Sequence, residues 1–230
     1  APQPWRPALA EHLDPLDELR AGLGELDTAG LRRRRRVVTT PCRPGTRLAD
    51  RAEPVLAFCS NDYLGLAADP AIAEAVRRGS LRWGTGAGAS HLVSGHYAAH
   101  DALEQRLAAF TGMDDALYFS TGYMANIGVM PALVGRGDAI FADKVNHASL
   151  VDGALLSRAE FIRYPHCDVA ALESRLAASR AQRKLIVTDG VFSMDGDIAP
   201  LRELLALAET HQAWLLVDDG IFGRPVIKPD

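Results

Sequence analysis

Polar side chains of the kind used in catalysis follow four short apolar runs in this 230-residue sequence. The first run leads into STGY at residues 120–123, and the second is followed closely by NHAS at residues 146–149. The third leads into TDGVFSMDGD at residues 188–197, and the fourth ends in the pair Asp218-Asp219. Hydroxyls, carboxylates, an amide and an imidazole are the groups that bind ligands and move protons. If the four runs are parallel strands of one sheet, their carboxyl ends place these groups at a single edge.

Each of these motifs also has a purely structural interpretation. STGYMAN, residues 120–126, places hydroxyls and a glycine at a helix start, which favours a phosphate but also caps an ordinary helix. His147 could contact a ligand or hold a loop through hydrogen bonds. FSMDGD, residues 192–197, resembles a capped turn, and its spacing is not that of a calcium loop, so we expect no metal.

Two other stretches invite a nucleotide or nucleic-acid interpretation. GTGAGAS, residues 84–90, follows a helical pattern and lacks the Lys-Ser/Thr of a P-loop. We therefore expect a glycine loop that is flexible or that lets another part of the molecule approach closely, and this disfavours a nicotinamide dehydrogenase. The five arginines at residues 32–36 could bind nucleic acid, but the net charge of -4 favours a solvated helix end or a site for an anionic substrate.

The composition limits the class of protein. A content of 48% hydrophobic and 23% charged residues is ordinary for a globular chain, and the net charge gives no attraction to nucleic acid or anionic membrane. The apolar runs are too short to span a bilayer, and the first residues lack a signal pattern. Cys42, Cys59 and Cys167 are scattered, which fits a reducing cytoplasm and argues against a disulfide framework or a structural zinc. We therefore expect a cytoplasmic protein with no nucleic-acid and no membrane partner.

The elements that must position the polar groups alternate between helix and strand. Residues 9–35 carry leucines at helical spacing, and helices are also expected near 69–83 and 99–111. The strands expected after these helices are 116–120, 139–142, 160–164, 184–189 and 214–219. The helices expected between them are 123–134, 147–157, 168–182 and 200–211. This alternation predicts an α/β fold, with a mostly parallel open sheet and helices on both faces.

Taken together, STGYMAN, NHASL, TDGVFSMDGD and VDD resemble the fold-type-I pyridoxal-phosphate enzymes, and more closely the α-oxoamine synthase family. SNDYLGL at 60–66 and GTGAGASHLVSGHYAAHDALE at 84–104 recur in that family in this order and spacing. The resemblance runs from about Leu16 to Asp219. It implies the cofactor pyridoxal 5'-phosphate (PLP) and a homodimer whose sites form between two subunits.

The resemblance also divides the chain. It implies an N-terminal helical segment and linker at 1–53, a partial PLP-binding large domain at 54–219, and an atypical tail at 220–230.

The activity that the resemblance implies is the decarboxylative condensation of an amino acid with an acyl thioester. The stretch 90–97 is most similar to the branch that joins L-alanine to a pimeloyl thioester, on CoA or acyl carrier protein, in biotin synthesis. A branch that makes another aminoketone, such as 2-amino-3-ketobutyrate, is the alternative within the family.

Two residues match the family's catalytic positions. Asp218 matches the aspartate that keeps the cofactor's ring nitrogen protonated, and an opposite charge within about 4–6 Å shifts a pKa by about 1–3 units. His147 matches the histidine that stacks on the cofactor ring and contacts the substrate.

Four more residues match binding positions. Ser193 matches the hydroxyl near the cofactor's phenolic oxygen, and Gly122 and Tyr123 match the loop whose backbone amides meet its phosphate. Arg32 matches the arginine that binds the substrate carboxylate, with a register within the arginine run that is open by one or two residues.

The chain departs from the family after the paired aspartates. The family has a histidine where Ile221 stands, and its Schiff-base lysine lies in a later motif. No lysine of this chain lies in a matching motif; the three are Lys144, Lys184 and Lys228. We therefore expect a C-terminally truncated or frame-disrupted product whose tail is neither helix nor strand and which is inactive alone. A non-catalytic fragment is the alternative from a different class.

Overall fold

The computed structural model describes residues 15–220 and 224–228. The chain forms two compact units, Ala1–Gly84 and Thr85–Asp230. The domain boundary expected at residues 53 and 54 lies inside the first unit, and the expected domain limits stay predictions.

The described residues of the first unit form two helices and a small sheet. Helix α1 spans Pro15–Thr28, strands β1 (Gly45–Thr46) and β2 (Val55–Leu56) pair antiparallel, and helix α2 spans Pro70–Trp83. Asp69 caps α2, because its carboxylate accepts hydrogen bonds from the backbone amides of residues 71 and 72 at 2.7 and 3.3 Å. Helix α1 lies within residues 9–35, where the leucine spacing predicts helix, and residues 9–14 lie outside the described residues.

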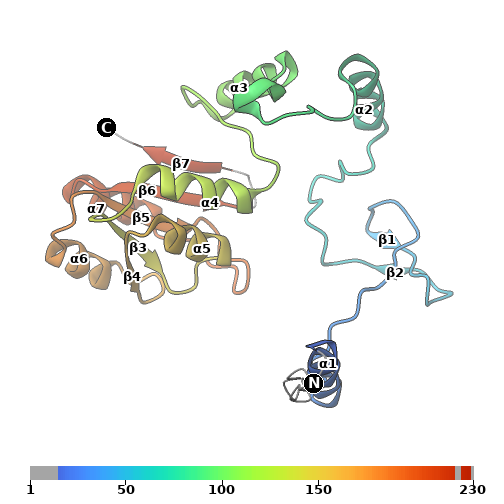
Figure 1. The fold of residues 1–230 in the computed structure, drawn as a ribbon, viewed down its shortest axis with the longest axis horizontal. Coiled ribbons are helices and arrows are strands. Elements are labelled where there is room, and N and C mark those ends of the chain that lie inside the picture. The colour runs from blue at the N-terminus through green and yellow to red at the C-terminus, as the bar shows by residue number, and fades with distance from the viewer. Residues whose placement is uncertain (1–14, 221–223, 229–230) are drawn as a thin grey trace, which may run out of the picture. The chain divides into compact units, whose positions relative to one another are not determined.

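The second unit is built on a five-stranded sheet with the strand order β4-β3-β5-β6-β7 (Figure 1). The strands are β3 (Ala139–Asp143), β4 (Glu160–Tyr164), β5 (Lys184–Asp189), β6 (Trp214–Asp219) and β7 (Arg224–Lys228). The first four are parallel to their neighbours, and β7 pairs antiparallel with β6. The predicted α/β fold with a mostly parallel open sheet is confirmed.

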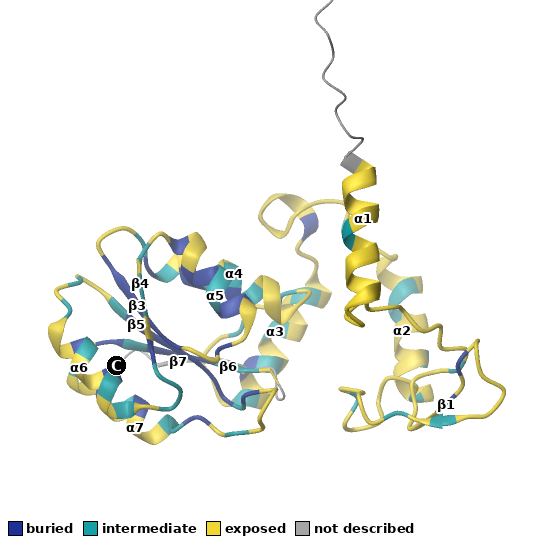
Figure 2. Ribbon diagram, turned by 90° about the horizontal axis from the view of Figure 1, so that it is seen from below, coloured by how far each residue is buried: buried dark blue, intermediate teal, exposed yellow. Residues whose placement is uncertain are grey.

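Helices lie on both faces of this sheet, as predicted (Figure 2). The helices of this unit are η1 (a π-helix, His91–Gly95), α3 (Ala98–Thr111), α4 (Gly122–Leu133), α5 (Ala148–Ser157), α6 (Val169–Ala178) and α7 (Leu201–Thr210). Side chains of α4 and α5 pack with Ile140 and Ala142 of β3, whereas those of α6 and α7 pack with Ala139 and Phe141. Successive residues of β3 thus serve opposite cores, as the two-residue period of a strand requires. None of the described helices has the length and apolarity needed to cross a membrane.

Two expectations for the strands are wrong. Residues 116–120 form no strand, although their sequence has strand propensity, because the described residues offer them no strand partner. The backbone amide of Tyr118 instead donates to the Glu104 carboxylate at 3.0 Å. The tail expected to be neither helix nor strand contains β7, and Ile221 lies outside the described residues.

Helices α4 and α5 approach each other most tightly at Gly153. A Cβ atom on this residue would lie 2.8 Å from the carbonyl oxygen of Asn126 and 3.1 Å from the sulfur of Met130. Met130, Leu150 and Ala154 around this contact are fully buried. Only glycine therefore lets the backbone of α5 lie directly against that of α4.

We predict that Gly153→Ala lowers the free energy of unfolding by about 1–3 kcal/mol, because the added methyl group overpacks the helix contact. Urea denaturation monitored by circular dichroism measures the effect. Gly128→Ala in α4 is the matched control, since its Cβ would meet Phe119 at an ordinary 3.5 Å. Equal stability of the two variants would contradict the prediction.

Candidate functional site

Three carboxylates end three adjacent strands at one edge of the sheet. Asp143 ends β3, Asp189 ends β5, and Asp218 lies one residue before the end of β6. Asp189 and Asp218 are partners in the parallel register of their strands. Asp143 and Asp189 are buried, and Asp218 is half-buried. The sheet edge predicted from the sequence to hold the site is therefore strongly acidic.

Asp218 is joined to His147 by a chain of hydrogen bonds. The amide nitrogen Nδ2 of Asn126 donates to Oδ2 of Asp218 at 2.6 Å and to Oγ of Ser149 at 3.0 Å. The same Ser149 Oγ lies 2.7 Å from Nδ1 of His147. Asn126 and Ser149 are buried, whereas His147 is exposed. The two residues expected to be catalytic thus belong to one network.

His147 also begins helix α5. Its Nδ1 accepts a hydrogen bond from the backbone amide of Ser149 at 3.3 Å, and its own backbone amide donates to Oδ2 of Asp189 at 3.0 Å. The side chain of the neighbouring Asn146 makes two hydrogen bonds to β5. Its Nδ2 donates to the carbonyl of Val187 at 2.9 Å, and its Oδ1 accepts from the backbone amide of Asp189 at 3.3 Å. The loop before α5 is therefore fastened to the end of β5.

Asp189 carries an unusual carboxyl group. Burial raises its pKa to about 6, the backbone amide of His147 opposes this, and the charges of Asp218 and Asp143 add to it. Within the part of the chain that the structure describes, its Oδ1 atom is buried without a hydrogen-bond partner. Protonation would relieve both the desolvation and the repulsion from the neighbouring carboxylates.

The loop after β5 carries Ser193 at an exposed turn. An isolated bridge between Val191 and Ile198 closes the loop at its base. His166 fastens it from the side, because its Nδ1 lies 3.0 Å from Oδ1 of Asp143 and its Nε2 lies 2.6 Å from Oδ2 of Asp197. The hydrogen bond with Asp197, followed by that with Asp143, raises the pKa of His166 against the effect of burial. Both ring nitrogens can donate together only when the imidazole is protonated.

The start of α4 leaves backbone donors available. Thr121 caps the helix, since its hydroxyl accepts from the backbone amide of Met124 at 3.1 Å. Among the described residues, the amides of Gly122 and Tyr123 make no hydrogen bond, and a Cβ on Gly122 would meet nothing within 4 Å. The phenol of Tyr123 donates to Asp152 of α5, and this contact raises the pKa of the phenol. The helix start therefore presents free N–H groups at an open position.

The remaining sequence candidates lie elsewhere. Arg32 belongs to the first unit, where it forms an ion pair with Asp27, and its substrate role stays a prediction. Lys184 begins β5, far from the carboxyl end of that strand, and its ammonium group donates to the carbonyl of Leu176 at 3.1 Å. Burial raises the pKa of the Cys167 thiol, which disfavours the reactive thiolate and agrees with an incidental cysteine.

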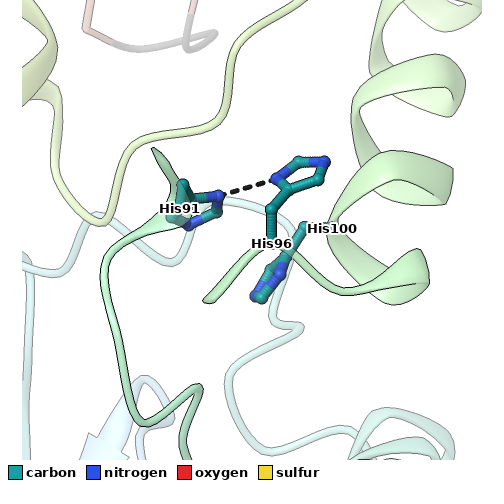
Figure 3. A group of neighbouring side chains, drawn as sticks. All are labelled: His91, His96 and His100. Atoms are coloured by element: carbon teal, nitrogen blue, oxygen red, sulfur yellow. Dashed lines mark hydrogen bonds between the residues drawn. The ribbon is translucent and has the colours of Figure 1, made fainter. Parts of the chain in front are cut away.

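A cluster of three histidines lies outside this strand-end site, near the start of α3 (Figure 3). One nitrogen of each of His91, His96 and His100 lies within 4.8 Å of the others. Nδ1 of His91 and Nδ1 of His96 are 2.8 Å apart, and Nδ1 of His100 accepts from the backbone amide of Tyr97 at 3.0 Å. These hydrogen bonds engage one nitrogen of each ring and account for the clustering. The expectation of no metal stays a prediction.

Sequence reasoning did not single out four of the residues that hold the site together. They are Asn126, Ser149, Asp189 and His166, and each makes side-chain hydrogen bonds to the strand-end groups. Asn126 and Ser149 lie in the polar motifs STGYMAN and NHASL, so these motifs gave a usable signal for them. His166 lies in no polar motif, and its role follows only from the fold.

The strand-end groups fit the chemical groups of PLP. Among the described residues, Oδ2 of Asp218 accepts a hydrogen bond and Oδ1 does not, so one carboxylate oxygen is free for a cationic ring N–H. The free amides at the start of α4 suit a phosphate. These two donor and acceptor sets belong to the same compact unit.

A sequence profile of aminotransferase class I and II matches residues 53–223. The chain belongs to this family. Its members depend on PLP, and a serine palmitoyltransferase from S. paucimobilis was solved with a bound PLP–myriocin aldimine. The expected cofactor class is therefore confirmed at the level of the family.

Two relatives with high sequence identity to this chain have the same name. The chain is 69% identical to an 8-amino-7-oxononanoate synthase of Aromatoleum aromaticum over 93% of its own length and 55% of the relative. It is 60% identical to one of Herminiimonas arsenicoxydans, over 90% of its length and 54% of the relative. The chain therefore spans about half the length of the curated relatives it matches.

Solved structures confirm the fold. A serine palmitoyltransferase of Sphingomonas wittichii matches with a TM-score of 0.81 at 36% identity, covering 90% of this chain and 52% of that one. An 8-amino-7-oxononanoate synthase from Francisella tularensis matches with a TM-score of 0.58 at 31% identity, covering 70% of this chain and 43% of that one.

We predict that Asp189→Asn changes how stability depends on pH. The native state holds a proton on Asp189 up to about pH 6, whereas the unfolded chain loses it near the ordinary value, so this group makes stability fall as pH rises between those values. Asparagine removes the effect, so the variant should gain about 1–3 kcal/mol relative to wild type between pH 4 and pH 7. Denaturant unfolding at both pH values measures the difference. Asp195→Asn, an exposed neighbour, should show no such gain, and a pH-independent difference for Asp189→Asn would refute the prediction.

We predict that Asp197→Asn loosens the loop that carries Ser193. Because the pKa of His166 is raised, the bridge between Asp143 and Asp197 is intact below the ordinary histidine value and is lost as pH rises through the raised value. Hydrogen exchange of residues 190–197, corrected for intrinsic rates, should be faster in Asp197→Asn by roughly 2- to 10-fold at pH 6. Asp195→Asn removes the same charge from the same loop without touching His166 and should exchange like wild type. Identical exchange in both variants would show that the bridge does not hold the loop.

Proposed function

We propose that this chain forms the cofactor-binding half of an 8-amino-7-oxononanoate synthase, which joins L-alanine to a pimeloyl thioester in biotin synthesis. The supporting observation is the hydrogen-bonded connection from Asp218 through Asn126 and Ser149 to His147. It occurs in a chain that is 69% and 68% identical to two proteins of that name.

PLP, when bound, supplies an electron sink for the charge that develops on the substrate carbon. Asp218 would hold a proton at the ring nitrogen, since a carboxylate next to a ring N–H favours the protonated ring by about 1.4–4 kcal/mol. Asn126 fixes the orientation of this carboxylate through the 2.6 Å hydrogen bond to Oδ2. The free oxygen Oδ1 is then the atom that would accept from the ring.

The other candidate residues would bind and orient the cofactor and the substrate. The amides of Gly122 and Tyr123 would receive the cofactor's phosphate, and the hydroxyl of Ser193 would donate to its phenolic oxygen. His147, exposed at the start of α5, would cover the ring and contact the amino acid. Arg32 would bind the carboxylate of the substrate.

The other aminoketone-forming branches are less favoured. The serine palmitoyltransferases that match in fold are 33–36% identical to this chain, and the solved oxononanoate synthase is 31% identical. Eight curated oxononanoate synthases are 56–69% identical. A homodimer in the cytoplasm is part of the proposal, and the strongly exposed Leu92 and Phe110 are apolar surface that a second subunit could cover.

A chimera tests the activity. Residues up to Asp219 of this chain, joined to the remaining C-terminal part of the Aromatoleum aromaticum relative, should release CO₂ from L-alanine only when a pimeloyl thioester is supplied. Release of free CoA from acetyl-CoA in the presence of glycine, without CO₂, would instead favour the 2-amino-3-ketobutyrate alternative, because that product keeps the glycine carboxylate. A folded chimera that binds PLP but releases no CO₂ from L-alanine and the pimeloyl thioester would refute the proposal.

We predict that Asp218→Asn in this chimera lowers both PLP affinity and turnover by about 10- to 1000-fold, because the amide cannot hold a charge against the ring nitrogen. Asp219→Asn removes a carboxylate from the adjacent position of β6 and should change either value less than about threefold, within the range of an ordinary surface substitution. PLP absorbance titration and CO₂ release measure the two quantities. Equal losses in both variants would contradict the specific role of Asp218.

A further inference from the structure

Asn126 and Ser149 connect Asp218 to His147 by hydrogen bonds, and the charge of Asp218 determines which atom donates in each of them. A carboxylate only accepts hydrogen bonds, so the Asn126 side-chain atom that lies 2.6 Å from it must be the amide nitrogen and not the oxygen. The second hydrogen of that nitrogen lies toward Oγ of Ser149, which therefore accepts at 3.0 Å. The carboxylate of Asp218 thus determines that Oγ of Ser149 is the acceptor in its hydrogen bond with Asn126.

The hydroxyl of Ser149 then has its single hydrogen left to donate. The neighbouring atom is Nδ1 of His147, at 2.7 Å. The backbone amide of Ser149, which can only donate, lies 3.3 Å from the same nitrogen. Two donors therefore converge on Nδ1, which must present a lone pair. A neutral imidazole in this position carries its proton on Nε2.

We propose that Asn126 and Ser149 are positioning residues that transmit the orientation imposed by the Asp218 carboxylate to His147 and fix His147 in the Nε2–H form. The outward nitrogen of His147 is then a hydrogen-bond donor, suited to an acceptor atom of a bound ligand and unable to take up a proton in this state. The catalytic meaning of this arrangement rests on the proposed function, but the arrangement itself does not require a cofactor.

The burial of the two intermediates supports this assignment. Asn126 and Ser149 are 3% and 1% exposed, so water cannot readily replace either partner. The close contact of α5 with α4 at Gly153 keeps Ser149 and Asn126, which lie on those two helices, at a fixed separation. Side chains held in this way cannot exchange donor and acceptor roles without leaving a buried polar atom unpaired.

The ¹⁵N and ¹³C chemical shifts of the His147 ring, assigned with His147→Gln, test the proposal in the chain without PLP. Wild type should be in the Nε2–H form. Ser149→Ala should lower the ratio of the Nε2–H form to the Nδ1–H form by roughly 2- to 10-fold, the effect of one hydrogen bond. Ser157→Ala is the matched control, because it removes a buried hydroxyl of the same helix. That hydroxyl donates to the carbonyl of Ala154 at 2.6 Å and accepts from the backbone amide of Ala159 at 3.1 Å, and neither partner belongs to the network. This control should leave the His147 spectrum unchanged.

A second variant covers the case in which Ser149→Ala does not fold. Asp218→Asn removes the charge that orients Asn126 and should also lower the ratio, whereas Asp219→Asn should not. A Nδ1–H ring in wild type, or a ratio that is unchanged in both Ser149→Ala and Asp218→Asn, would overturn the proposal. Because no cofactor or substrate is present, this failure is distinct from a failure to bind PLP or to release CO₂, which would overturn the proposed function.

Discussion

The burial of parallel strands on both faces is the constraint on which the site depends. Residues along β3 and β5 pack alternately into two apolar cores, so few polar side chains lie within these two strands. They gather where the strands end, and the parallel register brings Asp189 and Asp218 side by side there. The concentration of acid at one edge is thus a consequence of how the sheet is covered.

That concentration has an energetic cost, and the surrounding polar groups offset it unequally. Asp218 is held by Asn126, and Asp143 accepts from the backbone amides of Val145 and Cys167 at 2.8 Å. Asp189 has the least favourable environment, because one of its oxygens is buried without a partner in the described region. The adjacent acids therefore differ in character: one is suited to keep a charge, and another to keep a proton.

Much of the fold could be predicted from the sequence, because strands buried on both faces leave continuous apolar runs and their helices have clear periodicity. The strand at residues 160–164 and the strands ending at Asp189 and Asp219 lie where the pattern places them. Residues 116–120 show the limit of this reasoning, since strand propensity is local and a strand needs a partner. Strand β7 shows the opposite error: a segment with a proline and no alternating pattern pairs with β6.

For the site, the motifs identified the ends of the strands but not the connections between them. Asn126 precedes Asp218 by 92 positions in the sequence, and no local pattern announces their hydrogen bond. His166 bonds to Asp143 and Asp197 from a turn whose sequence gives no sign of either partner. Such contacts depend on the packing of helices against the sheet, which periodicity alone does not determine.

The His147 side chain has two roles, the proposed contact with the ligand and the capping of helix α5, and mutational experiments have to separate them. Its ring accepts a hydrogen bond from the backbone amide of Ser149 at the start of α5, so removing the ring also removes a helix cap. An alanine at this position would confuse lost chemistry with a frayed helix. Asparagine, which caps helices well but has no imidazole, would isolate the contribution of the ring itself.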